Sequence, residues 1–113
     1  MVSYDMALTV APGRRPPVER ELLRLAQGRR LKVVAIQPWE LDLFRERLAS
    51  GRIRIGTLVS LPAPAQESAS GRGPLLKTAR RAGVRILDAG SDPERPREAR
   101  NRARGLMRRA RKA

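Results

Sequence analysis

Two pairs of carboxylates are the first candidates for acid–base chemistry in this sequence. Glu19 and Glu21 form one pair, and Glu40 and Asp42 form the other. Each pair falls in the first turns of a predicted helix, where the positive end of the helix dipole stabilises negative charge. We therefore interpret both pairs as helix-stabilising residues.

The chain contains no cysteine and no histidine. It therefore offers neither thiolate nor imidazole ligands to zinc, and it lacks the side chain that most often moves protons near neutral pH. It also contains no Walker A lysine motif and no G-x-S-x-G nucleophile motif. We expect no metal site and no cofactor.

Basic residues outnumber acidic ones by more than two to one. Lysine and arginine number 25 against 11 aspartates and glutamates, which gives a formal net charge of +14 and a pI near 11.8. The excess predicts a polyanionic partner, RNA or DNA, although the base composition of the gene explains it equally simply. Tyr4, Trp39 and Phe44 are the only aromatic residues, too few for a base-stacking platform. Binding would therefore be to phosphates.

Residues 92–113 carry nine cations against three carboxylates. A stripe of mostly small apolar residues runs from Ala99 to Ala113 at helical spacing. Two interpretations stay open: a helix docked on the sheet, or an arm that becomes helical only when bound. Because the stripe is mostly alanine, we expect residues 95–113 to be removable without unfolding the rest. The candidate nucleic-acid contacts are Arg95, Arg97, Arg100, Arg102, Arg104, Arg108, Arg109, Arg111 and Lys112.

Apolar periodicity predicts strands that alternate with helices. We expect strands at 6–10, 31–36, 53–60 and 84–88 and helices at 16–28, 39–51 and 74–83. The strand starts are 25, 22 and 31 residues apart, which leaves room for a crossover helix and makes the strands parallel neighbours. Gly28 is placed to end the first helix in the left-handed conformation, and Gly56 to allow a close backbone approach or a bend. The pattern fits either a small doubly wound sheet or a curved half of an α/β barrel.

The sequence has no apolar run that approaches the roughly 18 residues of a membrane span. Residues 1–10 contain no basic residue of the kind that opens a signal or transit peptide. We expect a cytoplasmic protein without a membrane partner.

Four short blocks lie along the predicted strands and their ends. They are Asp5–Thr9 with Pro12, Val33–Pro38 before a helix that ends in Arg47-Leu48, Ile55–Pro62, and Lys77 leading to Ala82–Asp88. In order and spacing these blocks resemble the amino-terminal half of a deoxyribose-phosphate aldolase, a class I aldolase. The resemblance implies four β/α units of a TIM (β/α)8 barrel. It also implies that Asp5, near the start of the barrel, and Asp88, which would assist proton transfer at a Schiff base, are catalytic residues. The alternative for Asp88, at the end of a predicted strand, is a turn-forming carboxylate.

The chain departs from the family's pattern at several positions. Leu61 stands where the family has phenylalanine, Ala63-Pro64-Ala65 replaces a glycine-rich segment, and Ala35 replaces a small polar or thiol residue. The family's Schiff-base lysine belongs to the later half of the barrel, which this chain lacks.

The three lysines are not placed to replace that group. Lys32 begins a strand, Lys77 lies within a helix and Lys112 lies in the basic segment. A class I aldolase needs an amine made nucleophilic by burial or by a second nearby cation. We therefore expect no cleavage of 2-deoxyribose 5-phosphate by the isolated chain.

The sequence predicts two alternative functions. The first is a shortened aldolase-like domain, inactive alone, with an α/β domain at 1–91 resembling half a TIM barrel and a basic helix or arm at 92–113. The second is a small basic protein that binds RNA or DNA phosphates. We also expect a homodimer or larger assembly, formed by joining the strand at 84–88 of one copy to the strand at 6–10 of another. A strand order of 1-2-3-4 would support the barrel, and 2-1-3-4 would reject it.

Overall fold

A computed structural model of the chain describes residues 2–10, 17–61, 72–89 and 95–111. Strands and helices alternate through these residues. In chain order they are β1 (Val2–Thr9), α1 (Pro17–Gly28), β2 (Val33–Ile36), the 3-10 helix η1 (Pro38–Glu40), α2 (Leu41–Ala49), β3 (Ile53–Ser60), α3 (Arg72–Arg81), β4 (Arg85–Asp88) and α4 (Pro96–Arg111).

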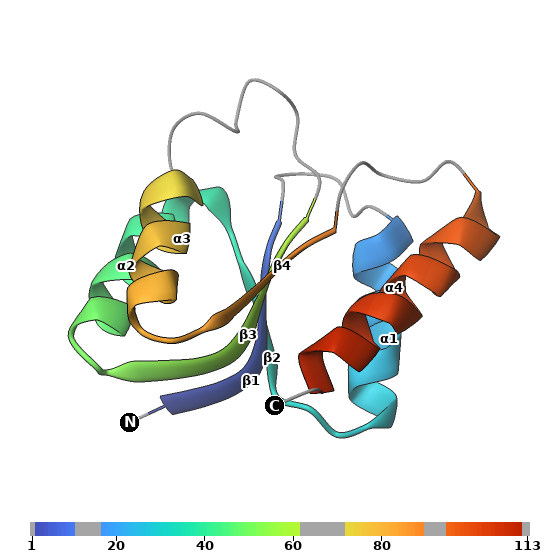
Figure 1. Ribbon diagram of the computed structural model, residues 1–113, viewed down its shortest axis with the longest axis horizontal. Helices are drawn as coiled ribbons and strands as arrows, with labels where there is room; N and C mark the ends of the chain where they lie inside the picture. The colour runs from blue at the N-terminus through green and yellow to red at the C-terminus, as the bar shows by residue number, and fades with distance from the viewer. Residues whose placement is uncertain (1, 11–16, 62–71, 90–94, 112–113) are drawn as a thin grey trace.

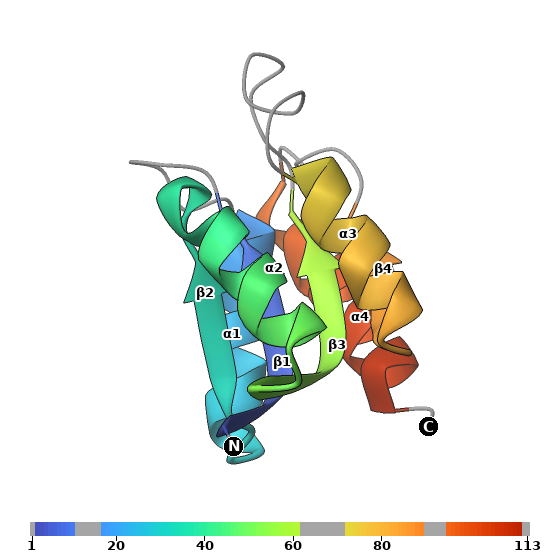
Figure 2. The same ribbon diagram turned by 90° about the vertical axis from the view of Figure 1, so that its left-hand side faces the viewer.

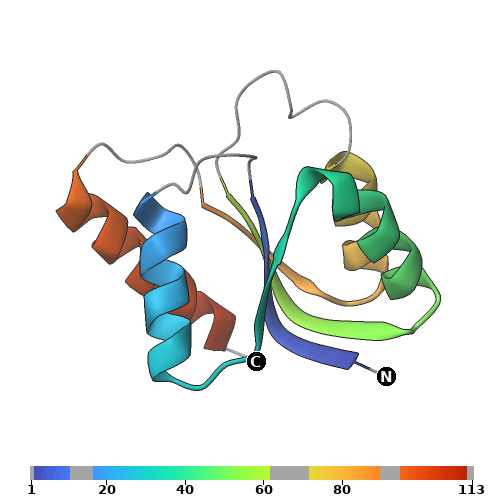
Figure 3. The same cartoon turned by 180° about the vertical axis from the view of Figure 1, so that it is seen from behind.

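The strands form one parallel sheet in the order β2-β1-β3-β4. Helices α1 and α4 cover one face of this sheet, and α2 and α3 cover the other (Figures 1 and 3). The molecule is therefore a three-layer α/β structure.

This strand order confirms the parallel α/β class and its four β/α units, and it corrects the expectation of half a barrel. In a barrel consecutive strands are neighbours and every helix lies outside. Here the connection after β2 passes over β1 to its other side, so α1 lies on one face of the sheet and α2 and α3 lie on the other, as in a doubly wound sheet. β1 is also internal, paired with β2 on one side and β3 on the other, so it offers no edge for the expected dimer.

A bulge interrupts β1 at Asp5 and Met6. The backbone N–H groups of both residues donate to the carbonyl oxygen of Lys32, with N···O distances of 2.8 and 3.2 Å. Because two residues of β1 lie opposite one residue beside them, the alternation of the β1 side chains shifts by one position. Tyr4 accordingly packs with the α2–α3 layer, whereas Met6 and Leu8 pack with the α1–α4 layer.

The side-chain alternation of β3 also shifts by one position, at Gly56, at the same level of the sheet as the bulge in β1. Ile53 and Ile55 pack with the α2–α3 layer, and Val59 packs with the α1–α4 layer. A Cβ atom on Gly56 would lie 2.9 Å from the carbonyl oxygen of Asp5, so only glycine fits without a backbone shift. The close approach expected at this glycine is confirmed. In Figure 1 the amino-terminal parts of β1 and β3 curve toward α2.

The basic segment forms a docked helix in the described residues. Ala99, Ala103, Leu106 and Met107 are buried in the core that α4 shares with α1 and the sheet. Small alanines let α4 approach its neighbours closely, while Leu106 and Met107 fill the remaining space. The premise that the segment is lightly packed, and therefore removable, is contradicted.

The first helix ends differently from the expectation. Its last residue is Gly28, but the left-handed conformation falls two residues later, at Arg30, with φ of 56°. The N–H of Leu31 donates to the carbonyl oxygen of Ala26 and closes the turn. Gly51 and Gly83 do adopt positive φ after the second and third α-helices.

Gly56→Ala should lower the free energy of unfolding by about 1–3 kcal/mol, because the added methyl group meets backbone that cannot yield cheaply. Urea denaturation of the full chain measures this. Gly105→Ala in α4 is the matched control: its Cβ would meet nothing within 4 Å. That change should be neutral or stabilising by up to about 1 kcal/mol. Equal effects at the two positions would contradict the assigned close approach.

Leu106→Ala should lower the free energy of unfolding by about 2–5 kcal/mol, because it empties a packed site between α4 and the sheet. Arg108→Ala, an exposed position on the same helix, should change it by about 0.5 kcal/mol or less. Thermal or urea unfolding followed by circular dichroism compares the two. A Leu106→Ala variant as stable as the parent would show that α4 is not part of the folded body.

Candidate functional site

Asp5, one of the two predicted catalytic carboxylates, caps the start of β2. Its Oδ2 accepts a hydrogen bond from the backbone N–H of Lys32 at 2.8 Å. The Lys32 ammonium lies 5.3 Å from the centre of the Tyr4 ring. This hydrogen bond holds the bulge in place, so Asp5 has a structural role in the described geometry.

Asp88, the other predicted catalytic residue, lies at the carboxyl end of β4, exposed. The strand register aligns it with Ser60 and, through β3, with Thr9. Asp5 precedes Thr9 by four residues on β1, which is about 13 Å along a strand. The two aspartates are therefore not brought together.

The lysines do not complete an aldolase-like constellation within the described residues. Lys32 is engaged with Tyr4 near the start of β2, and Lys77 is exposed on α3. Lys112 lies outside the described residues.

The carboxyl edge of a doubly wound sheet is where such folds bind ligands, at the point where the strand order reverses. That point lies between β1 and β3. The Thr9 hydroxyl there is already engaged: it donates to the carbonyl oxygen of Val59 at 3.5 Å and accepts from the N–H of Leu61 at 3.3 Å. It serves to join the ends of the two central strands.

Among the described residues, no cluster of three or more acidic side chains is arranged to hold a metal ion. Within the same ranges, no helix combines the length and apolar character that crossing a membrane requires.

One arginine of α4 ties the helix to the sheet, and two others line a groove. Arg102 is half-buried and donates from Nη1 to the carbonyl oxygen of Ala89 at 3.1 Å, which ties α4 to the end of β4. At the other end of the helix, Arg85 of β4 donates to the carbonyl oxygen of Arg109 at 2.8 Å. These contacts are architectural.

Arg104 and Arg108 line a groove between α1 and α4. Arg97, Asn101, Arg104 and Arg108 recur at spacings of four, three and four positions, so they share one side of α4. Asn101, Arg104 and Arg108, with Leu25 of α1 and Arg29 just after that helix, line a hollow of about 420 Å³. Figure 3 shows α1 and α4 crossing on this side of the sheet.

This groove lies on the strongly basic layer of the molecule. Residues 17–30 and 95–111 contain 12 arginines against three carboxylates, Glu19, Glu21 and Glu98. Glu19 is buried, and Glu21 pairs with Arg24 at 2.8 Å. The exposed side of the α1–α4 layer is thus dominated by guanidinium groups.

Most of the predicted contacts on the basic segment are exposed: Arg95, Arg97, Arg100, Arg104, Arg108 and Arg109. Arg102 is the exception, because its guanidinium is used to hold the helix in place. The side chain of Arg111 and all of Lys112 lie outside the described residues. The groove also contains Arg29, which the sequence did not single out. Arg29 follows the amphipathic helix that ends at Gly28, and the packing of α1 on α4 brings it to the groove.

No protein-family model and no curated protein matches the chain. Among solved structures, it is similar to a de novo designed Rossmann fold protein, over 99% of this chain and 100% of that one, with 16% sequence identity and a TM-score of 0.50. This likeness agrees with the parallel, doubly wound sheet and concerns the fold alone.

Arg102→Gln should lower the free energy of unfolding by about 1 kcal/mol, because it removes a half-buried hydrogen bond to the end of β4. Arg104→Gln removes the same charge two residues away, from an exposed position, and should change it by about 0.5 kcal/mol or less. Chemical denaturation of both variants separates architectural arginines from those of the groove. Equal stabilities would contradict the division.

Proposed function

We propose that this protein binds nucleic acid through its phosphates, and that the groove between α1 and α4 is the centre of the contact surface. The observation that carries the proposal is the convergence of Arg29, Arg104 and Arg108 from two helices on one hollow. Guanidinium groups bind phosphate oxygens bidentately, and Asn101 adds a neutral donor beside them.

The length of the arginine side of α4 supports a polymeric ligand. From Arg97 to Arg108 the helix rises by about 16 Å. One strand of duplex DNA places a phosphate about every 3.4 Å along its axis, so this side of α4 spans about five phosphates. A row of cations on a rigid helix suits a backbone better than a single small anion.

The same surface supports binding without sequence preference. Phosphate contacts position a protein on nucleic acid, whereas base-edge contacts carry sequence information. The described part of this layer contains no aromatic side chain on which a base could stack. The partner class is therefore a phosphate backbone, in RNA or in DNA.

Arg29, Arg104 and Arg108 changed together to glutamine should flatten the dependence of log affinity on log salt by about 2 units, because each phosphate contact contributes about 0.7–0.9. Fluorescence anisotropy with labelled single-stranded RNA and duplex DNA, at several salt concentrations, measures the slope. The matched control changes Lys77, Arg80 and Arg81 of α3 to glutamine, which removes the same charge from the opposite layer.

The control should leave the slope nearly unchanged. An equal loss in both triple variants would assign the binding to net charge rather than to the groove. Absence of binding by the parent protein even at low salt would refute the proposed function.

A further inference from the structure

Large apolar side chains are exposed on the first two turns after β2. Trp39 of η1 is 74% exposed and Leu43 of α2 is 41% exposed. Arg47 follows at the same spacing, so the three residues form one stripe, which we call the Trp39 stripe. Single exposed apolar residues are ordinary, but here two large ones lie one turn apart.

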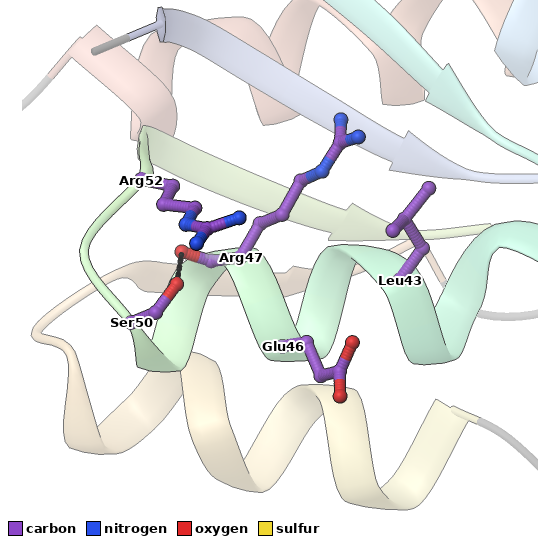
Figure 4. A pocket seen from close by; sticks show the side chains of 5 residues that line it. All are labelled: Leu43, Glu46, Arg47, Ser50 and Arg52. Atoms are coloured by element: carbon purple, nitrogen blue, oxygen red, sulfur yellow. Dashed lines mark hydrogen bonds between the residues drawn. The ribbon is translucent and has the colours of Figure 1, made fainter.

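A hollow adjoins this stripe. It measures about 350 Å³ and is lined by Leu43, Glu46, Arg47, Ser50 and Arg52. In Figure 4 the side chains of Leu43 and Arg47 extend from the same side of α2, and the Ser50 hydroxyl donates to the carbonyl oxygen of Arg47 at 3.2 Å. A cavity of about 150 Å³ holds benzene, so an indole ring fits in this volume.

We propose that the Trp39 stripe is the contact surface of a homodimer, with two α2 helices packed antiparallel about a two-fold axis at Leu43. Trp39 and Arg47 lie four residues on either side of Leu43. In an antiparallel pair the Trp39 ring of each copy is level with Arg47 of the other and enters its hollow. An isologous interface requires this reciprocal pairing. Tryptophan is also the aromatic ring that attracts a guanidinium most strongly.

The local charge of α2 favours self-association through this helix over self-association through the basic α1–α4 layer. Residues 38–50 carry three carboxylates and two arginines, in a chain whose net charge is +14. The basic α1–α4 layer lies on the other side of the sheet, and at physiological salt the Debye length is about 8 Å. Two copies that approach through α2 therefore meet less repulsion than two copies that approach through the α1–α4 layer.

The edge of the sheet formed by β2, beside this face, is also open to a second copy of the chain. β2 is an edge strand of Val33–Ile36 without a charged residue, whereas the other edge, β4, has Arg85 and Asp88 exposed. Charged side chains are one of the ways in which proteins protect an edge strand, and the four residues of β2 include none. Figure 2 shows β2 along the side of the sheet where η1 and α2 begin.

The test is sedimentation equilibrium of the full chain, free of nucleic acid, from 1 to 100 µM. Wild type should form dimers within this range, and Leu43→Arg should weaken them at least tenfold, because it brings two cations together at the axis. Ala49→Arg adds the same side chain at an exposed position of α2 outside the Trp39 stripe, and it should leave the dimer unchanged.

The fluorescence of Trp39, the single tryptophan, gives a second readout. Its quenching by acrylamide should fall at least twofold between 1 and 100 µM in wild type and should stay constant in Leu43→Arg. A wild-type monomer at 100 µM would overturn the proposal, as would a dimer that survives Leu43→Arg with Trp39 still open to quencher. Neither measurement contains nucleic acid, so the outcome is independent of the proposed function.

Discussion

The carbonyl oxygen of Lys32, which accepts the N–H groups of both Asp5 and Met6, sets the arrangement of the whole sheet. Below this bulge the side chains of β1 and β3 face the opposite layers from those they would face in a regular strand. Tyr4, Ile53 and Ile55 can therefore cover the inner side of α2. Without this shift in alternation, the same side chains would face away from the α2–α3 layer.

The sequence predicts most elements of this fold because their signals are local. Helical spacing and glycine punctuation identify α1, α2 and α3, and β-branched runs identify β2 and β3. The start of β1 is missed by four residues, because Val2–Asp5 pairs with β3 in a bent ribbon that has no strong apolar run. Strand order is missed as well, since it depends on which side of β1 each crossover passes, and periodicity carries no record of that choice.

Only part of the candidate site could be predicted from the sequence, because the rest depends on tertiary contacts. The arginines of the basic segment are visible in the sequence, but their division into structural and exposed groups depends on tertiary contacts, such as that of Arg102 with Ala89. Arg29 joins the groove only because α1 packs against α4. Asp5 illustrates the converse: a carboxylate chosen for a family resemblance turns out to cap a strand, through a backbone N–H that no sequence pattern reveals.

The central position of β1 shapes the order in which the protein can fold. β1 pairs with β2 at a separation of 27 residues and with β3 at 51, while neither edge strand pairs with the other. During synthesis the strand at the middle of the sheet emerges first and must wait for both neighbours. Such non-local pairing slows folding and leaves apolar segments open meanwhile. Met6–Leu8, fully buried in the folded protein, is therefore an apolar segment that stays incompletely paired until both β2 and β3 have been synthesised.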